Sequence, residues 1–218
     1  MDGLVLKIVV GNKKYSSWSL RAWLVLKHAG VPFEEIVVGL DMPETAASIR
    51  KYSPSGRVPA LIDGDVTVWD SLAISEYLHE KLPEKRLWPK DAAQRARARS
   101  VAAEMHSGFA NLRNDCSMKI VQQYTRKPLR PETQAEVDRI VAIWEECLKQ
   151  SGGPFLFGKE PCIADAFYAP VVSRFRTYSI PVSGAAKAYC DAIWAWPPLQ
   201  AWVADAQRET LRAKFHED

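Results

Sequence analysis

Hydrophobic and polar residues follow two different patterns along this chain of 218 residues. Up to about residue 80, short β-branched runs alternate with helical patterns, whereas helical periodicity covers the rest of the chain. A change of this kind is typical of two domains, one with helices packed on a sheet and one built of helices alone. We therefore predict domains at 1–82 and 92–218, separated by a proline-containing linker at 83–91.

The first domain is predicted to be α/β, with the element order βαβαββα. A polar turn at 11–14 separates its first strand from a helix that ends at Gly30, a residue suited to a left-handed helix end. The turn Asp63-Gly64-Asp65 joins the last two strands into an antiparallel hairpin. Strands are expected at 4–10, 33–38, 58–62 and 66–69, a short polar helix at 42–51, and a last helix that opens at Asp70-Ser71.

The second domain is predicted to be all-α, a bundle of amphipathic helices bounded by proline or glycine. Its first helical pattern is long and continues to residue 122, and Pro128 and Pro131 separate it from the next. Helices are predicted at 92–122, 132–150, 164–178, 185–194 and 199–209.

Charge and cysteine content exclude several classes of function. The 29 basic and 26 acidic residues are mixed along the chain and leave a net charge of +3, which is too balanced for a nucleic-acid binder. No apolar run approaches the roughly twenty residues of a membrane span, and no leader pattern is present, so we expect a cytoplasmic location and no membrane partner. The four cysteines lack zinc-ligand spacing, so we predict free thiols and no metal.

The order of motifs in the first domain is more specific than any single motif. Val58-Pro59 precedes the hairpin, and Asp70-Ser71 opens the helix that follows it. This combination resembles the thioredoxin-like domain of glutathione transferases. The resemblance implies a cis Val58–Pro59 bond and a glutathione site that includes Arg57, Val58 and Pro59, with the Val58 backbone pairing with the cysteinyl part of glutathione. It further implies that Ser71 binds the γ-glutamyl carboxylate and Asp70 the γ-glutamyl ammonium.

The loop before the first helix is where this family places its thiol-activating side chain, and here it is rich in hydroxyls. A free thiol has a pKa near 8.5, so a hydroxyl that donates to sulfur at a helix N-terminus raises the reactive thiolate fraction. The serine pair is similar to the zeta-class signature. We rank the candidate activators as Ser16, then Ser17, then Tyr15, and expect an unused serine to cap the helix. Trp18 is a candidate substrate contact, whereas most other tryptophans are expected in the core.

Three positions in the helical domain extend the resemblance. The segment around His106 is similar to a beta-class segment whose histidine reaches toward the glutathione sulfur, so His106 has either that role or a core or interface role. Arg113, seven residues further on, falls on the same face of the predicted helix and is a candidate for the acceptor-substrate pocket. Asp165 matches the family's helix capping box, in which Cys162 replaces the usual Ser or Thr and is expected to weaken one of the two bonds.

The resemblance implies an enzyme that uses glutathione as co-substrate, attacks a small apolar electrophile in detoxification, and forms a homodimer. Two other functions remain open. The serine pair would also suit a glutathione-dependent isomerase or dehalogenase. The fold would also suit a non-catalytic protein-interaction module, although such a module needs neither the loop hydroxyls nor Asp70-Ser71.

Overall fold

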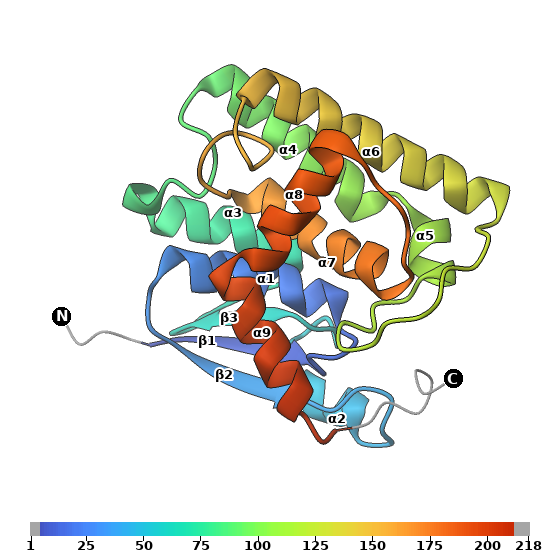
Figure 1. The fold of residues 1–218 in the computed structure, drawn as a ribbon. Coiled ribbons are helices and arrows are strands. Elements are labelled where there is room, and N and C mark those ends of the chain that lie inside the picture. Colours follow the sequence, from blue (N-terminus) through green and yellow to red (C-terminus); the bar gives the residue numbers. More distant parts are fainter. Residues whose placement is uncertain (1–4, 212–218) are drawn as a thin grey trace.

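A computed structural model describes residues 5–211 and contains a four-stranded sheet in the order β2-β1-β3-β4 (Figure 1). β1 (Leu6–Gly11) pairs in parallel with β2 (Phe33–Val38) and antiparallel with β3 (Ala60–Asp63), which pairs antiparallel with β4 (Val66–Val68). The predicted thioredoxin-like fold with a helical second domain is confirmed. Leu4, the predicted first strand residue, lies outside the described residues.

Helices cover both faces of the sheet. Ile8 and Val10 of β1 belong to the main core, whereas Val9 belongs to a smaller cluster with Ile49, because alternate strand residues point to opposite faces. α1 (Ser17–Ala29) and α3 (Ser71–Lys81) pack against each other on the main-core side, and α2 (Thr45–Arg50) lies on the other (Figure 1). The glutathione-site motifs predicted at 57–59 and 70–71 therefore lie at the ends of elements fixed by this sheet.

The helical domain is centred on α7 (Ile163–Thr177), most of whose residues are buried. α7 packs on α1, on α4 (Ala92–Ser107) and on α8 (Gly184–Ala195), so the main core continues from the sheet into this domain. The remaining elements are a short 3₁₀ turn η1 (Pro83–Lys85), α5 (Ala110–Asp115), α6 (Pro131–Ser151) and α9 (Pro197–Arg208). No helix within residues 5–211 is long and apolar enough to cross a bilayer.

The single helix predicted at 92–122 is wrong, because α4 ends at Ser107. The Gly108 amide closes α4 on the Glu104 carbonyl, and a side chain at Gly108 would bring its Cβ within 2.7 Å of that oxygen. Phe109 then adopts the left-handed conformation, with φ 57°. The new helix α5 is capped from a distance by Glu136 of α6, whose carboxylate accepts from two amides, those of residues 111 and 112, at 3.2 and 2.7 Å.

Residues 116–130, here termed the crossing segment, replace the end of that predicted helix. The segment leaves α5, reaches the first domain, where the Ile120 amide donates to the Lys14 carbonyl at 3.2 Å, and returns to α6 (Figure 1). On its way back the Tyr124 amide donates to the Thr177 carbonyl at 2.6 Å. Pro131 starts α6, where its missing amide hydrogen costs nothing. The segment therefore links the loop before α1 to the end of α7.

The capping box of α7 is present with cysteine in the hydroxyl position. Asp165 accepts from the Cys162 amide at 2.8 Å and from the Leu156 amide at 3.1 Å, and the Cys162 side chain makes the reciprocal contact. The predicted cap at Asp165 is confirmed, and both reciprocal contacts form. The four cysteines are free, as predicted. The predicted core role of tryptophans is confirmed for the buried Trp23, Trp88, Trp144, Trp196 and Trp202.

Candidate functional site

The serine pair lies at the N-terminus of α1, with both side chains buried. Ser16 is the N-cap: its hydroxyl donates to Ser19 Oγ at 2.8 Å and accepts a long bond from the Ser19 amide. Ser19 Oγ in turn accepts from the Gly11 amide at 3.0 Å. Ser17 points toward α7, where its oxygen accepts from Arg174 Nη2 at 3.2 Å. The two hydroxyls therefore have different surroundings, one in the helix cap and one against a buried guanidinium.

A pocket of about 350 Å³ lies beside this helix end. It brings together the start of α1, the loop before β3 and the N-terminus of α3, and the Val58–Pro59 bond at its wall is cis, as the resemblance implied. Sequence analysis missed two of its lining residues, Trp69, which directly precedes Asp70, and Ser55, which lies two residues before Arg57. We term it the candidate glutathione pocket, lined by Trp18, Ser55, Arg57, Val58, Pro59, Trp69 and Asp70.

Asp70 caps α3 and also contacts the helical domain. Its Oδ1 accepts from the amides of Leu72 and Ala73 at 2.9 and 3.3 Å, and its Oδ2 lies 2.9 Å from His106 Nε2. Burial acts to raise the pKa of Asp70, but the hydrogen bond and charge of His106 and the two amides outweigh it and hold this pKa below its ordinary value. Ser71 is fully buried, and its hydroxyl has no hydrogen-bond partner among the described residues.

Trp18 contacts two predicted site residues of the helical domain, His106 and Arg113. The rings of His106 and Trp18 form a T-shaped pair with 5.1 Å between ring centroids, and the Arg113 guanidinium lies 5.4 Å from the Trp18 centroid. Arg113 Nη1 also donates to the His106 carbonyl at 3.3 Å. His106 therefore occupies the domain interface, with Nε2 directed at Asp70. Tyr15 lies in the loop before α1 with its side chain half-buried, and its catalytic role stays a prediction.

Sequence analysis missed two buried arginines, Arg21 beside Trp18 and Arg174 beside Ser17. The Arg21 guanidinium is 4.4 Å from the Trp18 centroid and 5.3 Å from that of Phe167, and none of its three nitrogens has a hydrogen-bond partner within residues 5–211. Burial, with repulsion from Arg174 and Arg113, lowers the pKa of Arg21 to about 9. A buried cation without an acceptor is costly, so its surroundings suit an anionic ligand. The only sequence signal was an arginine at an apolar position of the first helix.

The loop before α1 is also held by the last helix. Lys13 is buried, and its ammonium lies 2.7 Å from Glu35 Oε1 and 2.6 Å from Asp205 Oδ2 of α9. The Trp202 indole donates to the Lys13 carbonyl at 2.8 Å, and Glu209 accepts from the Lys13 amide at 2.8 Å. These contacts fix the backbone just upstream of the serine pair.

Comparison with known proteins agrees with this architecture. Residues 15–81 match the glutathione S-transferase N-terminal domain and residues 123–205 the C-terminal domain, while the linker at 83–91 stays a prediction. A probable maleylacetoacetate isomerase of Caenorhabditis elegans is 32% identical over 77% of each chain. Glutathione S-transferase Z1 of Arabidopsis thaliana is 32% identical over 81% of this chain and 85% of its own.

Among solved structures, a glutathione transferase homologue from Burkholderia with bound glutathione superposes with a TM-score of 0.73. It is 26% identical, and the match covers 94% of this chain and all of the other. The chain belongs to the glutathione S-transferase family.

Proposed function

We propose that this protein binds glutathione in the candidate glutathione pocket and activates its thiol for attack on a small electrophile. The observation that carries this proposal is the convergence of the Val58–Pro59 edge, the capped N-terminus of α3 and the start of α1 on one pocket. The edge offers backbone groups to a peptide, and the helix end offers amides to a carboxylate. Trp18 and Trp69, which are 37% and 44% exposed, offer apolar rings to an apolar electrophile.

Ser16 is our first candidate for the thiol activator. It caps α1, where the helix dipole favours a thiolate, and rotation of its hydroxyl away from Ser19 frees a donor for sulfur. Ser17 is the second candidate, because its oxygen is already oriented toward α7 by Arg174. Tyr15 is the third.

Matched variants Ser16→Ala and Ser17→Ala test this order in a conjugation assay with a chromogenic electrophile. Loss of the activating donor should lower kcat/KM about 10²-fold or more, with glutathione binding retained and the thiol pKa of bound glutathione raised. The other variant should stay within a few-fold of the unmodified protein. If only Ser17→Ala loses activity, the order of the two serines is reversed. If both variants stay active, Tyr15 becomes the candidate activator, and Tyr15→Phe tests it.

A second candidate function is glutathione-dependent isomerisation of an unsaturated carboxylate. The arginines beside Trp18, Arg21 and Arg113, favour it, because Arg21 is buried, Arg113 is half-buried, and Arg21 has no acceptor in the described part of the chain. A relative with 32% identity is named a probable maleylacetoacetate isomerase. Assays with maleyl carboxylates should then show turnover that Arg113→Gln lowers about tenfold or more.

Halide release from a haloalkane tests the dehalogenase alternative.

Binding to glutathione separates both enzymatic functions from a non-catalytic interaction module. Calorimetric titration with glutathione should give one site per chain, weakened in Asp70→Asn. Absence of binding would exclude both enzymatic functions and leave the interaction module. The homodimer implied by the family resemblance stays a prediction, which light scattering can check.

A further inference from the structure

The guanidinium of Arg174, on α7, lies between the serine pair and the crossing segment, and the residue is only 3% exposed. It donates to Ser17 Oγ at 3.2 Å, to the Cys116 carbonyl at 2.8 Å and to the Pro170 carbonyl at 3.3 Å. All three acceptors are neutral, and no carboxylate within residues 5–211 pairs with this cation. Burying a charge without an opposite charge is costly, and a neutral donor would serve these acceptors. The positive charge therefore fits an anion that binds at the serine pair.

The ionisable groups that face Arg174 do not neutralise it. Arg21 of α1 and Arg113 of α5 are further cations, and burial, with repulsion from Arg113, lowers the pKa of Arg174 to about 10. Arg174 is still protonated at pH 7. Burial raises the pKa of Cys116 to about 11, so this thiol is uncharged at the same pH.

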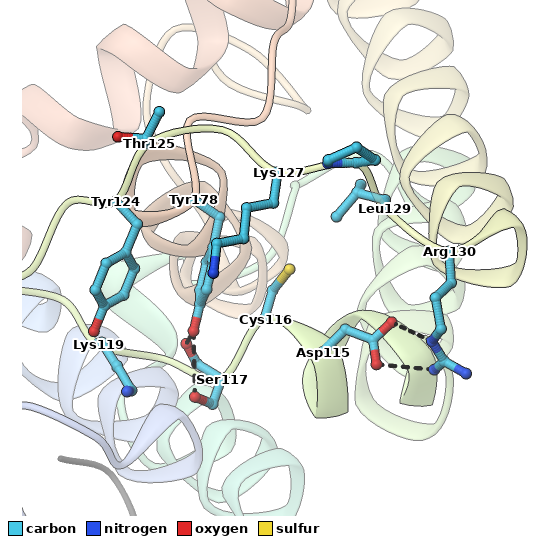
Figure 2. A pocket seen from close by; sticks show the side chains of 11 residues that line it. Asp115, Cys116, Ser117, Lys119, Tyr124, Thr125, Lys127, Leu129, Arg130 and Tyr178 are labelled. Atoms are coloured by element: carbon cyan, nitrogen blue, oxygen red, sulfur yellow. Dashed lines mark hydrogen bonds and ion pairs between the residues drawn. The ribbon is translucent and has the colours of Figure 1, made fainter. Parts of the chain in front are cut away.

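Polar groups on the side of the crossing segment are bound elsewhere. Asp115, which precedes Cys116 in the chain, is turned toward Arg130, and that guanidinium donates two bonds of 2.8 Å to its carboxylate (Figure 2). The Tyr178 hydroxyl donates to the Ser117 carbonyl at 3.1 Å and therefore keeps its proton (Figure 2). Neither group supplies a negative charge to the buried guanidinium.

Ser17 connects this charge to the start of α1. Because its oxygen accepts from Arg174, its hydroxyl hydrogen has to point away from the guanidinium, and no group in the described part of the chain accepts it. The Ser16 hydroxyl, in contrast, donates to Ser19. A hydroxyl that accepts from a cation is polarised and becomes a stronger donor. Ser17 therefore presents a polarised donor at a helix N-terminus, where the helix dipole favours an anion.

We propose that Arg174 stabilises the thiolate of bound glutathione, by its positive charge and by orienting the Ser17 hydroxyl toward the sulfur. This inference rests on the proposed function, because it requires glutathione in the candidate glutathione pocket. A sulfur that accepts from Ser17 lies one hydrogen bond beyond Oγ, and a cation within about 4–6 Å lowers the pKa of an acid by about 1–3 units. Charge acts over a longer range than a hydrogen bond, so this positioning residue stabilises the sulfur whether Ser16 or Ser17 is the main donor.

The test measures the pKa of the glutathione thiol in the complex, from the ultraviolet absorbance of the thiolate as the pH is varied. In the unmodified protein this pKa should lie about one unit or more below the ordinary thiol value of about 8.5. Arg174→Gln removes the charge and keeps an amide donor, and it should raise the thiol pKa by about one unit, which leaves about tenfold less thiolate below that pKa. Arg174→Lys keeps the charge without the fork of donors and should retain most of the lowering.

Arg176→Gln is the matched control, because Arg176 lies on the same helix with an exposed side chain against Trp194. It removes the same charge and should leave the thiol pKa and the KM for glutathione unchanged. A purely structural role of Arg174 would lower the stability of Arg174→Gln in urea unfolding without moving the thiol pKa. Arg174→Met is the second neutral variant, used if circular dichroism shows that Arg174→Gln does not fold.

Three results would overturn the inference while conjugation persists and the proposed function stands. The thiol pKa could be the same in the unmodified protein and in both Arg174 variants, or Arg174→Lys could raise it as much as Arg174→Gln, in which case charge is not the cause. The bound thiol of the unmodified protein could also titrate near about 8.5. Absence of glutathione binding by the unmodified protein would overturn the proposed function and this inference together.

Discussion

His106 Nε2 lies 2.9 Å from Asp70 Oδ2, so a histidine of the helical domain is paired with the carboxylate that caps α3. Asp70 lines the candidate glutathione pocket, whereas His106 is not part of the lining and packs against Trp18. The helical domain therefore orients a carboxylate in the wall of the candidate glutathione pocket and lowers the pKa of that carboxylate.

Replacing His106 should affect glutathione binding more than chemistry. We expect His106→Gln to raise the KM for glutathione several-fold and to change kcat less, because the variant loses the charge that holds the Asp70 carboxylate in place. Steady-state kinetics with varied glutathione measure both constants. His79→Gln, on α3 but outside the pocket lining, is the matched control and should leave KM unchanged. A fall in kcat with an unchanged KM would instead indicate that His106 acts on the glutathione sulfur.

Asp115 should contribute stability that depends on pH. The hydrogen bond from Arg130, then that from Thr133, holds the pKa of Asp115 below its ordinary value. Its contribution is therefore complete above the unfolded-state pKa of about 4 and is lost as the pH falls through the lower folded value. In urea unfolding, Asp115→Asn should be less stable than the unmodified protein at pH 7, with the difference shrinking toward pH 2.

A control for that measurement is Asp191→Asn, which breaks an exposed pair with Lys187 one helical turn away. Its effect should stay within about 0.5 kcal/mol. A difference for Asp115→Asn that grows on acidification would contradict the assignment.

Asp165→Ala should destabilise the whole protein. The variant leaves the buried amides of Cys162 and Leu156 without their acceptor, at a cost of about 2–4 kcal/mol in the free energy of unfolding. Urea denaturation measures it. Asp138→Ala, on the exposed face of α6, should cost less than about 0.5 kcal/mol. Equal losses in the two variants would show that the cap of α7 does not limit stability.

Lys13→Met should also destabilise, because it leaves Glu35 without its cation and Asp205 with only the exposed Arg208 as a partner. Both carboxylates are partly exposed, so we expect about 2 kcal/mol, below the roughly 3–5 kcal/mol of a fully buried pair. Urea unfolding measures this loss, and a conjugation assay on the folded variant should show reduced kcat because the serine pair begins three residues further on. If Lys13→Met is less stable but keeps its kcat, the contact between Lys13 and α9 does not contribute to catalysis.

Local chemistry explains what the sequence could predict. β-Branched runs and the turn at 63–65 specify the strands, and residues 58–59 and 70–71 indicate the pocket because a strand start and a helix cap are formed by neighbouring residues. The features that the sequence did not predict depend on contacts between residues far apart in the chain. The break at Gly108 requires Glu136 to cap α5, and the environment of Ser17 depends on Arg174, 157 residues away in the chain. Periodicity carries no information about such pairs.

The contact between Lys13 and α9 has a consequence for the order in which the protein is made. The strand and loop that lead to the serine pair emerge early from the ribosome, yet one of the two carboxylates that hold Lys13 belongs to the last helix of the described chain. A nascent chain that has completed only its first domain therefore has the contact of Lys13 with Glu35 but lacks those with Asp205 and Trp202. The loop before the serine pair therefore gains its full set of contacts only when α9 has folded against it.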